Sequence, residues 1–162
     1  MTPRLTLSPL GLALAALTLA CSSPSSEIAE GAPLPTFALE DLTGERVRSQ
    51  DLPNRPTVVS FWATWCQPCI REIPLLKELH ASPKVHLVSI ALDERGRDIV
   101  QPFVTDRHLP YPVLIGNETV FQRMGGLAIP YTILLNAEGT VVEIIRGRLT
   151  KEMVEVTLGP IS

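Results

Sequence analysis

The stretch VVSFWATWCQPCIREIP, residues 58–74, constrains the fold of this chain more than any other. It overlaps an uncharged run of β-branched and aromatic residues over 57–63, which predicts a central strand buried on both faces. The segment 69–81 that follows has apolar residues at helical spacing, which predicts an amphipathic helix. Cys66 and Cys69 lie at the junction. A strand that turns into a helix at a C-x-x-C pair is a specific setting for redox chemistry.

The positions of the two cysteines predict different tasks for them. The start of a helix carries partial positive charge and unpaired N–H groups, which stabilise a thiolate. Cys66 precedes the first turn, so we expect it to be exposed and to attack a partner. Cys69 lies one turn into the helix, so we expect it to be buried and to resolve the mixed disulfide. Pro68 lacks an N–H and therefore suits the first helical turn.

A structural disulfide and half of a zinc site are the other uses of such a pair. A bridge across two residues closes almost no loop, so it removes little entropy from the unfolded chain. Zinc needs four ligands, and each histidine has an ordinary reading: His80 at a helix end, His86 in a strand and His108 at the surface. The pattern therefore favours a redox couple, and we expect neither a metal nor a cofactor.

Length and charge limit the choice of partners. The chain has 162 residues, with 14 Lys and Arg against 17 Asp and Glu. This length suits one domain with a sizeable core, and we expect a monomer. The mild acidity argues against nucleic acid as a partner, because phosphate binding requires a basic face.

The N-terminus predicts export. After the single charge of Arg4 come sixteen uncharged residues, LTLSPLGLALAALTLA. This run is short for a membrane span, which needs about 20 residues, and it suits a signal peptide over residues 1–20. An uncleaved anchor is the alternative, which Pro9 and Gly11 disfavour. The next segment, 21–35, is rich in Ser, Pro and Gly and predicts a flexible tether.

The junction LTLAC resembles a bacterial lipoprotein signal, in which the cysteine becomes the lipidated first residue. It departs from the usual pattern at Thr18, where such signals prefer leucine. The resemblance implies that Cys21 carries acyl chains, which would hold the protein firmly on an extracytoplasmic membrane surface, either the periplasmic face or the cell surface of a bacterium. Cys66 and Cys69 then remain as the one free pair.

Strands and helices alternate along the rest of the chain, which predicts an α/β sandwich with a parallel portion. Pro74 lies inside the helix that follows the cysteines and should kink it, and Pro102 should make a later helix irregular or delay its start. The further predicted elements are a hairpin over 37–52, a strand over 85–93, a helix over 95–108, a strand over 111–116, a helix over 117–126, a hairpin over 131–147 and a helix over 150–158.

The motifs FWATWCQPC and GLAIPYTILLN together resemble the thioredoxin superfamily and, within it, the TlpA/ResA-like membrane-tethered thiol–disulfide oxidoreductases. The resemblance covers roughly residues 32–158. It implies a thioredoxin-like three-layer α/β sandwich with an N-terminal β-hairpin and a central helix–strand insert between Asp93 and Ile115. We assign this thioredoxin-like domain to residues 36–162. Pro74, five positions after the second cysteine, matches the kinked helix of the family.

The resemblance also implies how a partner is held. It implies that the Ile129-Pro130 peptide bond is cis, faces the cysteines and presents the Ile129 backbone to an extended partner as an added strand. Trp65 is implied to form a wall of the active site, beside Pro68. Tyr131 departs from the many relatives that carry threonine there, which bears on partner preference.

An acidic residue near the cysteines is a further family feature. Thioredoxins proper carry a buried aspartate six positions before the first cysteine, where this chain has Ser60. Glu72, three positions after Cys69, matches an acidic residue that the TlpA/ResA branch keeps near its cysteines, and it could handle the proton of Cys69. The alternative is a first-turn glutamate favoured only by the helix dipole.

The resemblance implies a membrane-tethered extracytoplasmic enzyme that reduces protein disulfides, for example in cytochrome c maturation. Its partners would be a protein client and an upstream membrane thiol reductant. A peroxidase is one alternative, but that chemistry needs a P-x-x-x-T/S-x-x-C run that neither cysteine has. A copper carrier of the Sco type is another, but those relatives use C-x-x-x-C and a distant histidine. A binding module with idle cysteines is a third.

Overall fold

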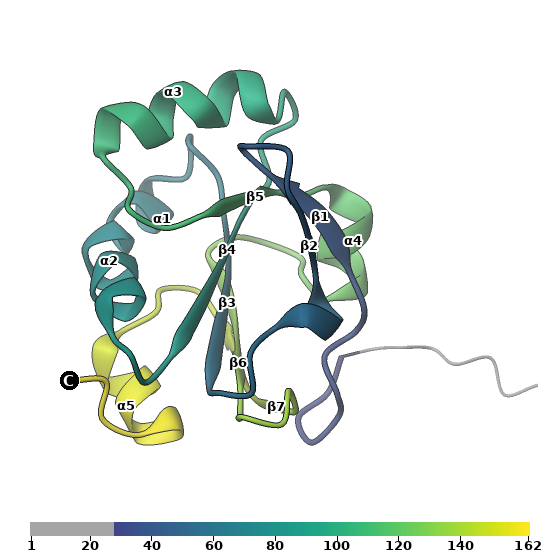
Figure 1. Cartoon of the computed structure of the whole chain (residues 1–162), viewed down its shortest axis with the longest axis vertical. Coiled ribbons are helices and arrows are strands. Elements are labelled where there is room, and N and C mark those ends of the chain that lie inside the picture. The colour runs from purple at the N-terminus through teal and green to yellow at the C-terminus, as the bar shows by residue number, and fades with distance from the viewer. Residues whose placement is uncertain (1–27) are drawn as a thin grey trace, which may run out of the picture.

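The computed structural model describes residues 28–162, which form a helix–sheet–helix sandwich around one seven-stranded sheet (Figure 1). The strands are β1 (Ala38–Asp41), β2 (Arg46–Arg48), β3 (Thr57–Trp62), β4 (His86–Ala91), β5 (Val113–Ile115), β6 (Tyr131–Leu135) and β7 (Val141–Arg146). The helices are α1 (Gln67–Ile70), α2 (Ile73–Ala81), α3 (Arg97–Arg107), α4 (Glu118–Arg123) and α5 (Lys151–Leu158), with a short 3-10 turn η1 (Ser49–Asp51).

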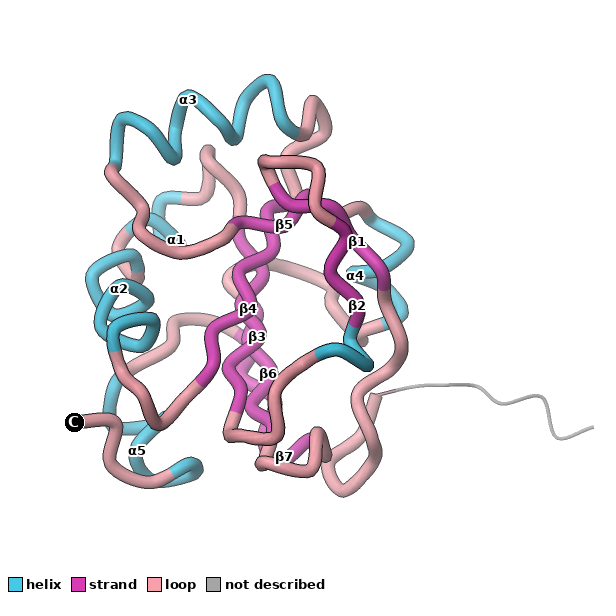
Figure 2. Tube along the Cα trace, in the orientation of Figure 1, coloured by secondary structure: helices cyan, strands magenta, loops and turns pink. Residues whose placement is uncertain are grey.

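The sheet has the order β2-β1-β5-β4-β3-β6-β7. Strands β3, β4 and β5 are parallel, while β1, β6 and β7 each run antiparallel to the neighbour that links them to this centre. Helices α1, α2 and α5 lie on one side of the sheet and α4 on the other, as Figures 1 and 2 show. This is the predicted thioredoxin-like α/β architecture, with its N-terminal hairpin formed by β1 and β2.

Strand β3 is the buried centre of the molecule, as its composition predicts. All six residues are buried, and its side chains alternate between two apolar clusters. Val58 and Trp62 belong to the cluster under α2 and α5, whereas Val59 and Phe61 belong to the cluster under α4. A strand that is hydrogen-bonded on both edges and packed on both faces is held firmly. Its end is therefore a fixed platform for the cysteines that follow.

The helix after the cysteines is split rather than only kinked. The predicted helix over 69–81 consists of α1 and α2, separated at Arg71 and Glu72. Pro74 is the second residue of α2, and its missing N–H prevents a continuous ladder with α1. In α3, by contrast, Pro102 lies inside a helix that runs without a break from Arg97 to Arg107. This proline is exposed to solvent, and the helix tolerates it.

The folded part of the chain begins earlier than the predicted boundary at residue 36. Ile28 is only 7 % exposed and packs so closely on Gly125 that a Cβ atom there would be 2.4 Å from its Cγ2. The Gly31 N–H donates to the Val141 carbonyl at 2.8 Å, and Pro33 forms a bridge with Thr140. Residues 28–35 of the predicted tether therefore lie against the domain. The predicted signal peptide and Cys21 lie outside the described residues.

Among residues 28–162, no helix has the length and apolar character that crossing a bilayer requires.

We expect Ile28→Ala to lower the free energy of unfolding by about 2–4 kcal/mol, because it removes a buried side chain from a packed contact. Urea denaturation of the oxidised protein measures this. The matched control is Glu30→Ala, an exposed neighbour in the same segment, which should change stability by less than about 0.5 kcal/mol. Equal stability of the two variants would show that the segment is a loose tether after all.

Candidate active site

The two cysteines form a disulfide at the end of β3. The S–S distance is 2.03 Å and the Cα atoms are 5.3 Å apart. Cys66 is the N-cap residue of α1, and its Sγ accepts a hydrogen bond from the Cys69 N–H at 3.3 Å. Pro68 lies in the first turn of α1, as predicted. The arrangement places sulfur at the positive end of a helix, where a thiolate is stabilised once the bond is reduced.

The burial of the pair differs from the sequence prediction in one respect. Cys69 is buried as expected, but Cys66 is also buried, with 4 % of its surface exposed. Both residues belong to the apolar cluster that includes Trp62 and Ala63. Trp65, immediately before Cys66, is 67 % exposed. The expectation of an exposed Cys66 is therefore wrong for the oxidised form.

The loop before β6 lies next to the disulfide. The Ile129-Pro130 peptide bond is cis, as the family resemblance implies. Because Tyr131 pairs with Phe61, the loop just before Tyr131 lies beside the end of β3, where the chain continues to Cys66. Among the described residues, no backbone hydrogen bond engages the N–H or the carbonyl of Ile129.

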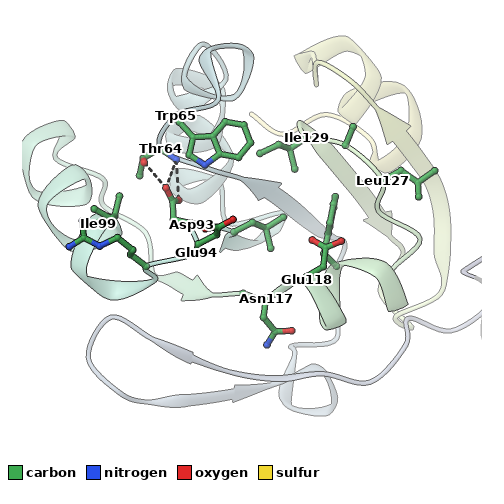
Figure 3. A pocket seen from close by; sticks show the side chains of 14 residues that line it. Thr64, Trp65, Asp93, Glu94, Ile99, Asn117, Glu118, Leu127 and Ile129 are labelled. Carbon is green, nitrogen blue, oxygen red and sulfur yellow. Dashed lines mark hydrogen bonds between the residues drawn. The ribbon is translucent and has the colours of Figure 1, made fainter.

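A groove of about 1070 Å³ opens between this loop, the cysteine turn and the starts of α3 and α4 (Figure 3). Apolar side chains and carboxylates line it, among them Trp65, Leu127, Ile129, Asp93, Glu94 and Glu118. Leu127 and Trp65 are strongly exposed apolar side chains. The structure thus brings two of the predicted partner-binding residues, Trp65 and Ile129, to one groove. Pro68 does not line it and is exposed on α1.

Glu72 is a buried acid and not a solvated first-turn residue. It is 2 % exposed, and its backbone N–H donates to the Cys69 carbonyl at 3.0 Å. One carboxylate oxygen accepts the Leu149 N–H at 2.6 Å, while the other has no partner among residues 28–162. Burial raises the pKa of Glu72 to about 7, against the opposing effects of the Leu149 hydrogen bond and the Arg148 charge. A carboxyl with this pKa can take up or release a proton near neutral pH.

Asp93 is a site residue that the sequence reasoning used only as a boundary of the insert. Its carboxylate accepts hydrogen bonds from the backbone N–H and the hydroxyl of Thr64, two positions before Cys66. The available signal was its place just after β4, because the parallel strands β3 and β4 end at the same edge of the sheet.

Within residues 28–162, no three His, Cys, Asp or Glu side chains are grouped as a metal ion would need. His80 lies at the end of α2, and His86 begins β4, where its ring nitrogen is 3.3 Å from the Arg55 guanidinium.

A disulfide at a strand-to-helix junction beside a cis-proline loop defines the class of thioredoxin-fold thiol–disulfide oxidoreductases. The Redoxin family model matches residues 29–158. The chain is 35 % identical to the thiol-disulfide oxidoreductase ResA of Bacillus thuringiensis over 136 residues, 82 % of this chain and 78 % of that protein. The chain therefore belongs to the Redoxin family, as a TlpA/ResA-like thiol–disulfide oxidoreductase, and it is an enzyme.

Solved structures agree with this assignment. A thioredoxin-family thiol:disulfide interchange protein from Chlorobium tepidum superposes with a TM-score of 0.68 at 28 % identity, covering 82 % of this chain and all (100 %) of that one. A thio-disulfide isomerase from Thermus thermophilus gives 0.68 at 29 % identity, covering 81 % and 95 %.

We expect Glu72→Gln to change how stability depends on pH. Because the folded-state pKa of about 7 lies above the ordinary value of 4.5, the folded protein binds the proton more tightly than the unfolded chain. The wild type should therefore lose stability as the pH rises from about 4.5 to about 7, and the variant should lack this component. Over this pH range the unfolding free energy of the variant should rise relative to that of the wild type by up to about 3 kcal/mol.

Urea denaturation of the oxidised proteins between pH 4.5 and 8 measures this difference. The control is Glu152→Gln on α5, an exposed acid, whose difference from the wild type should stay flat across the window. A flat difference for Glu72→Gln as well would show that Glu72 titrates like an ordinary solvated carboxyl.

Proposed function

We propose that this oxidoreductase works as a reductant of protein disulfides at the outer face of a membrane, with apocytochrome c as an example of a client. The observation that carries the proposal is the groove lined by Thr64 and Trp65, the two residues before Cys66, because a client segment that lies there contacts the turn that leads into the Cys66–Cys69 pair. Trp65 and Ile129 supply apolar contacts, and the unpaired Ile129 backbone supplies strand-like hydrogen bonds.

The reaction begins with the reduced pair. The Cys66 thiolate attacks one sulfur of the client disulfide, so a Cys66–client bond forms and the second client sulfur leaves as a thiolate. Cys69 then attacks the Cys66 sulfur, which releases the first client sulfur and closes the Cys66–Cys69 disulfide. Two electrons pass from the enzyme to the client. The upstream membrane thiol reductant restores the dithiol by the same exchange in reverse.

Glu72 provides the proton acceptor for the second step. Cys69 is buried and must lose its proton before it can attack, because the thiolate is the nucleophile. Glu72 follows Cys69 by three residues, has a carboxylate oxygen with no partner in the described chain and has a pKa of about 7. It takes the role that a buried aspartate has in thioredoxins proper, where this chain has Ser60.

A lipid on Cys21 would place this chemistry at the membrane. The supporting features are the LTLAC junction and the polar segment that follows it. Since residues 28–35 pack on the domain, the part of the predicted tether that precedes the packed chain is limited to residues 21–27.

We expect the reduced Cys69→Ser variant to accumulate a covalent mixed disulfide with its client, because nothing resolves the bond that Cys66 forms. Cys66→Ser should accumulate none, since Cys69 lies inside α1, whereas Cys66 is the N-cap residue at its start. Non-reducing electrophoresis after acid quenching, with mass spectrometry of the trapped partner, measures this. The Cys66→Ser/Cys69→Ser double variant is the control for client protein that is recovered with the enzyme without a covalent bond. Equal trapping by both single variants would contradict the ordered mechanism.

We expect mass spectrometry of the membrane fraction to show an acylated N-terminus at Cys21. Cys21→Ser removes the acceptor thiol and should abolish the acylated species. A mature wild-type chain that starts elsewhere and occurs in the soluble fraction would contradict the anchor.

A further inference from the structure

Asp93 lies where two active-site segments leave the sheet. Strands β3 and β4 are parallel and in register from Thr57 and His86 to Trp62 and Ala91. The pairing continues past the strand ends, because the Leu92 N–H donates to the Trp62 carbonyl at 2.8 Å. Asp93 therefore follows β4 at the level where the chain after β3 turns toward the cysteines.

The Asp93 carboxylate is buried, and its hydrogen bonds come from one residue, Thr64. It is 5 % exposed, and it accepts the Thr64 N–H at 3.1 and 3.3 Å and the Thr64 hydroxyl at 2.5 Å (Figure 3). None of the ion pairs found among residues 28–162 includes it. A buried carboxylate needs donors to offset its lost hydration, and hydrogen bonds to a charged acceptor are among the stronger ones. Thr64 and Asp93 therefore hold each other in place.

Thr64 is part of the turn that carries the nucleophile. The Cys66 N–H donates to the Ala63 carbonyl at 3.1 Å, so residues 63–66 form a tight turn with Thr64 and Trp65 at its centre. Holding Thr64 therefore sets the direction of the turn and the place of Cys66 at the start of α1. On the other side, the Gly96 N–H donates to the Asp93 carbonyl at 2.8 Å. Asp93 thus joins the cysteine turn to the segment that leads into α3.

We propose that Asp93 is a positioning residue for disulfide exchange, which fixes the turn carrying Trp65 and Cys66 against the groove. In the oxidised enzyme the Cys66–Cys69 bond also restrains this turn. In the reduced enzyme that bond is absent, so we expect the Asp93–Thr64 contact to restrain the turn there. The proposal rests on the proposed function, because it concerns the attack of Cys66 on a client disulfide.

The test is a single-turnover measurement with the full chain in detergent. Reduced enzyme in excess reacts with a peptide disulfide that carries a fluorophore and a quencher, which yields a maximal rate and a half-saturating concentration. Asp93→Asn should lower the maximal rate about tenfold, because a misplaced nucleophile reacts slowly. The half-saturating concentration should change less than about twofold, since Asp93 lines the groove with only 5 % of its surface exposed.

Matched variants separate the hydrogen bonds from the charge. Asp98→Asn makes the same chemical change in an exposed residue of α3 and should match the wild type. Thr64→Ser retains both donors and should also match it, whereas Thr64→Val keeps only the N–H and should slow the reaction part of the way. Adding Thr64→Val to Asp93→Asn should lower the rate no further. Additive losses, or an Asp93→Asn rate equal to that of Asp98→Asn, would overturn the proposal.

A second readout does not depend on activity. In the reduced protein, amide hydrogen exchange at Thr64 and Trp65 should be at least tenfold faster in Asp93→Asn than in Asp98→Asn, while amides of β3 stay protected in both. Unchanged exchange at the turn would overturn the proposal even if the enzyme reduces the peptide. A wild-type enzyme that fails to reduce any peptide disulfide, with the exchange difference present, would instead contradict the proposed function and leave the contact established.

Discussion

The placement of every active-site segment depends on strand β3. It is buried on both faces and hydrogen-bonded to β4 on one edge and β6 on the other. Because Trp62 pairs with Ala91 and Phe61 with Tyr131, the end of β3, the end of β4 and the start of β6 meet at one edge of the sheet. The cysteines follow the end of β3, Asp93 follows the end of β4, and the cis-proline loop precedes the start of β6. The catalytic geometry is thus set by sheet register.

Two buried carboxylates flank the cysteines, and their surroundings suit different tasks. Asp93 has both oxygens engaged by Thr64, an arrangement that holds a loop in place. Glu72 accepts one hydrogen bond from Leu149 and has a second oxygen with no partner within the described chain. Burial raises its pKa to about 7, against the opposing effects of the Leu149 hydrogen bond and the Arg148 charge. A proton can therefore move on and off Glu72 near neutral pH.

Features that depend on neighbouring residues were predictable. The buried strand β3, the two hairpins and the helices that begin after Asn117 and Thr150 appear where the pattern indicated. The prediction was wrong where tertiary packing decided the burial of a residue against the expectation from its local sequence. Residues 28–35 have the composition of a linker. Ile28 is nevertheless buried and packs against Gly125, a contact that composition does not reveal. The place of Cys66 before a helix predicts an exposed residue, yet Cys66 is buried with Cys69 in one apolar cluster.

The sequence by itself determined the redox couple, because a C-x-x-C pair three residues apart at a strand-to-helix junction is a local arrangement. Its resemblance to TlpA/ResA-like proteins also identified the cis Ile129-Pro130 bond. Only the tertiary structure decided which groups surround that couple. Thr64 and Asp93 are 29 residues apart, and Glu72 and Leu149 are 77 apart. Contacts over such separations depend on which strands become neighbours in the sheet, and the local pattern of one segment does not specify its neighbours.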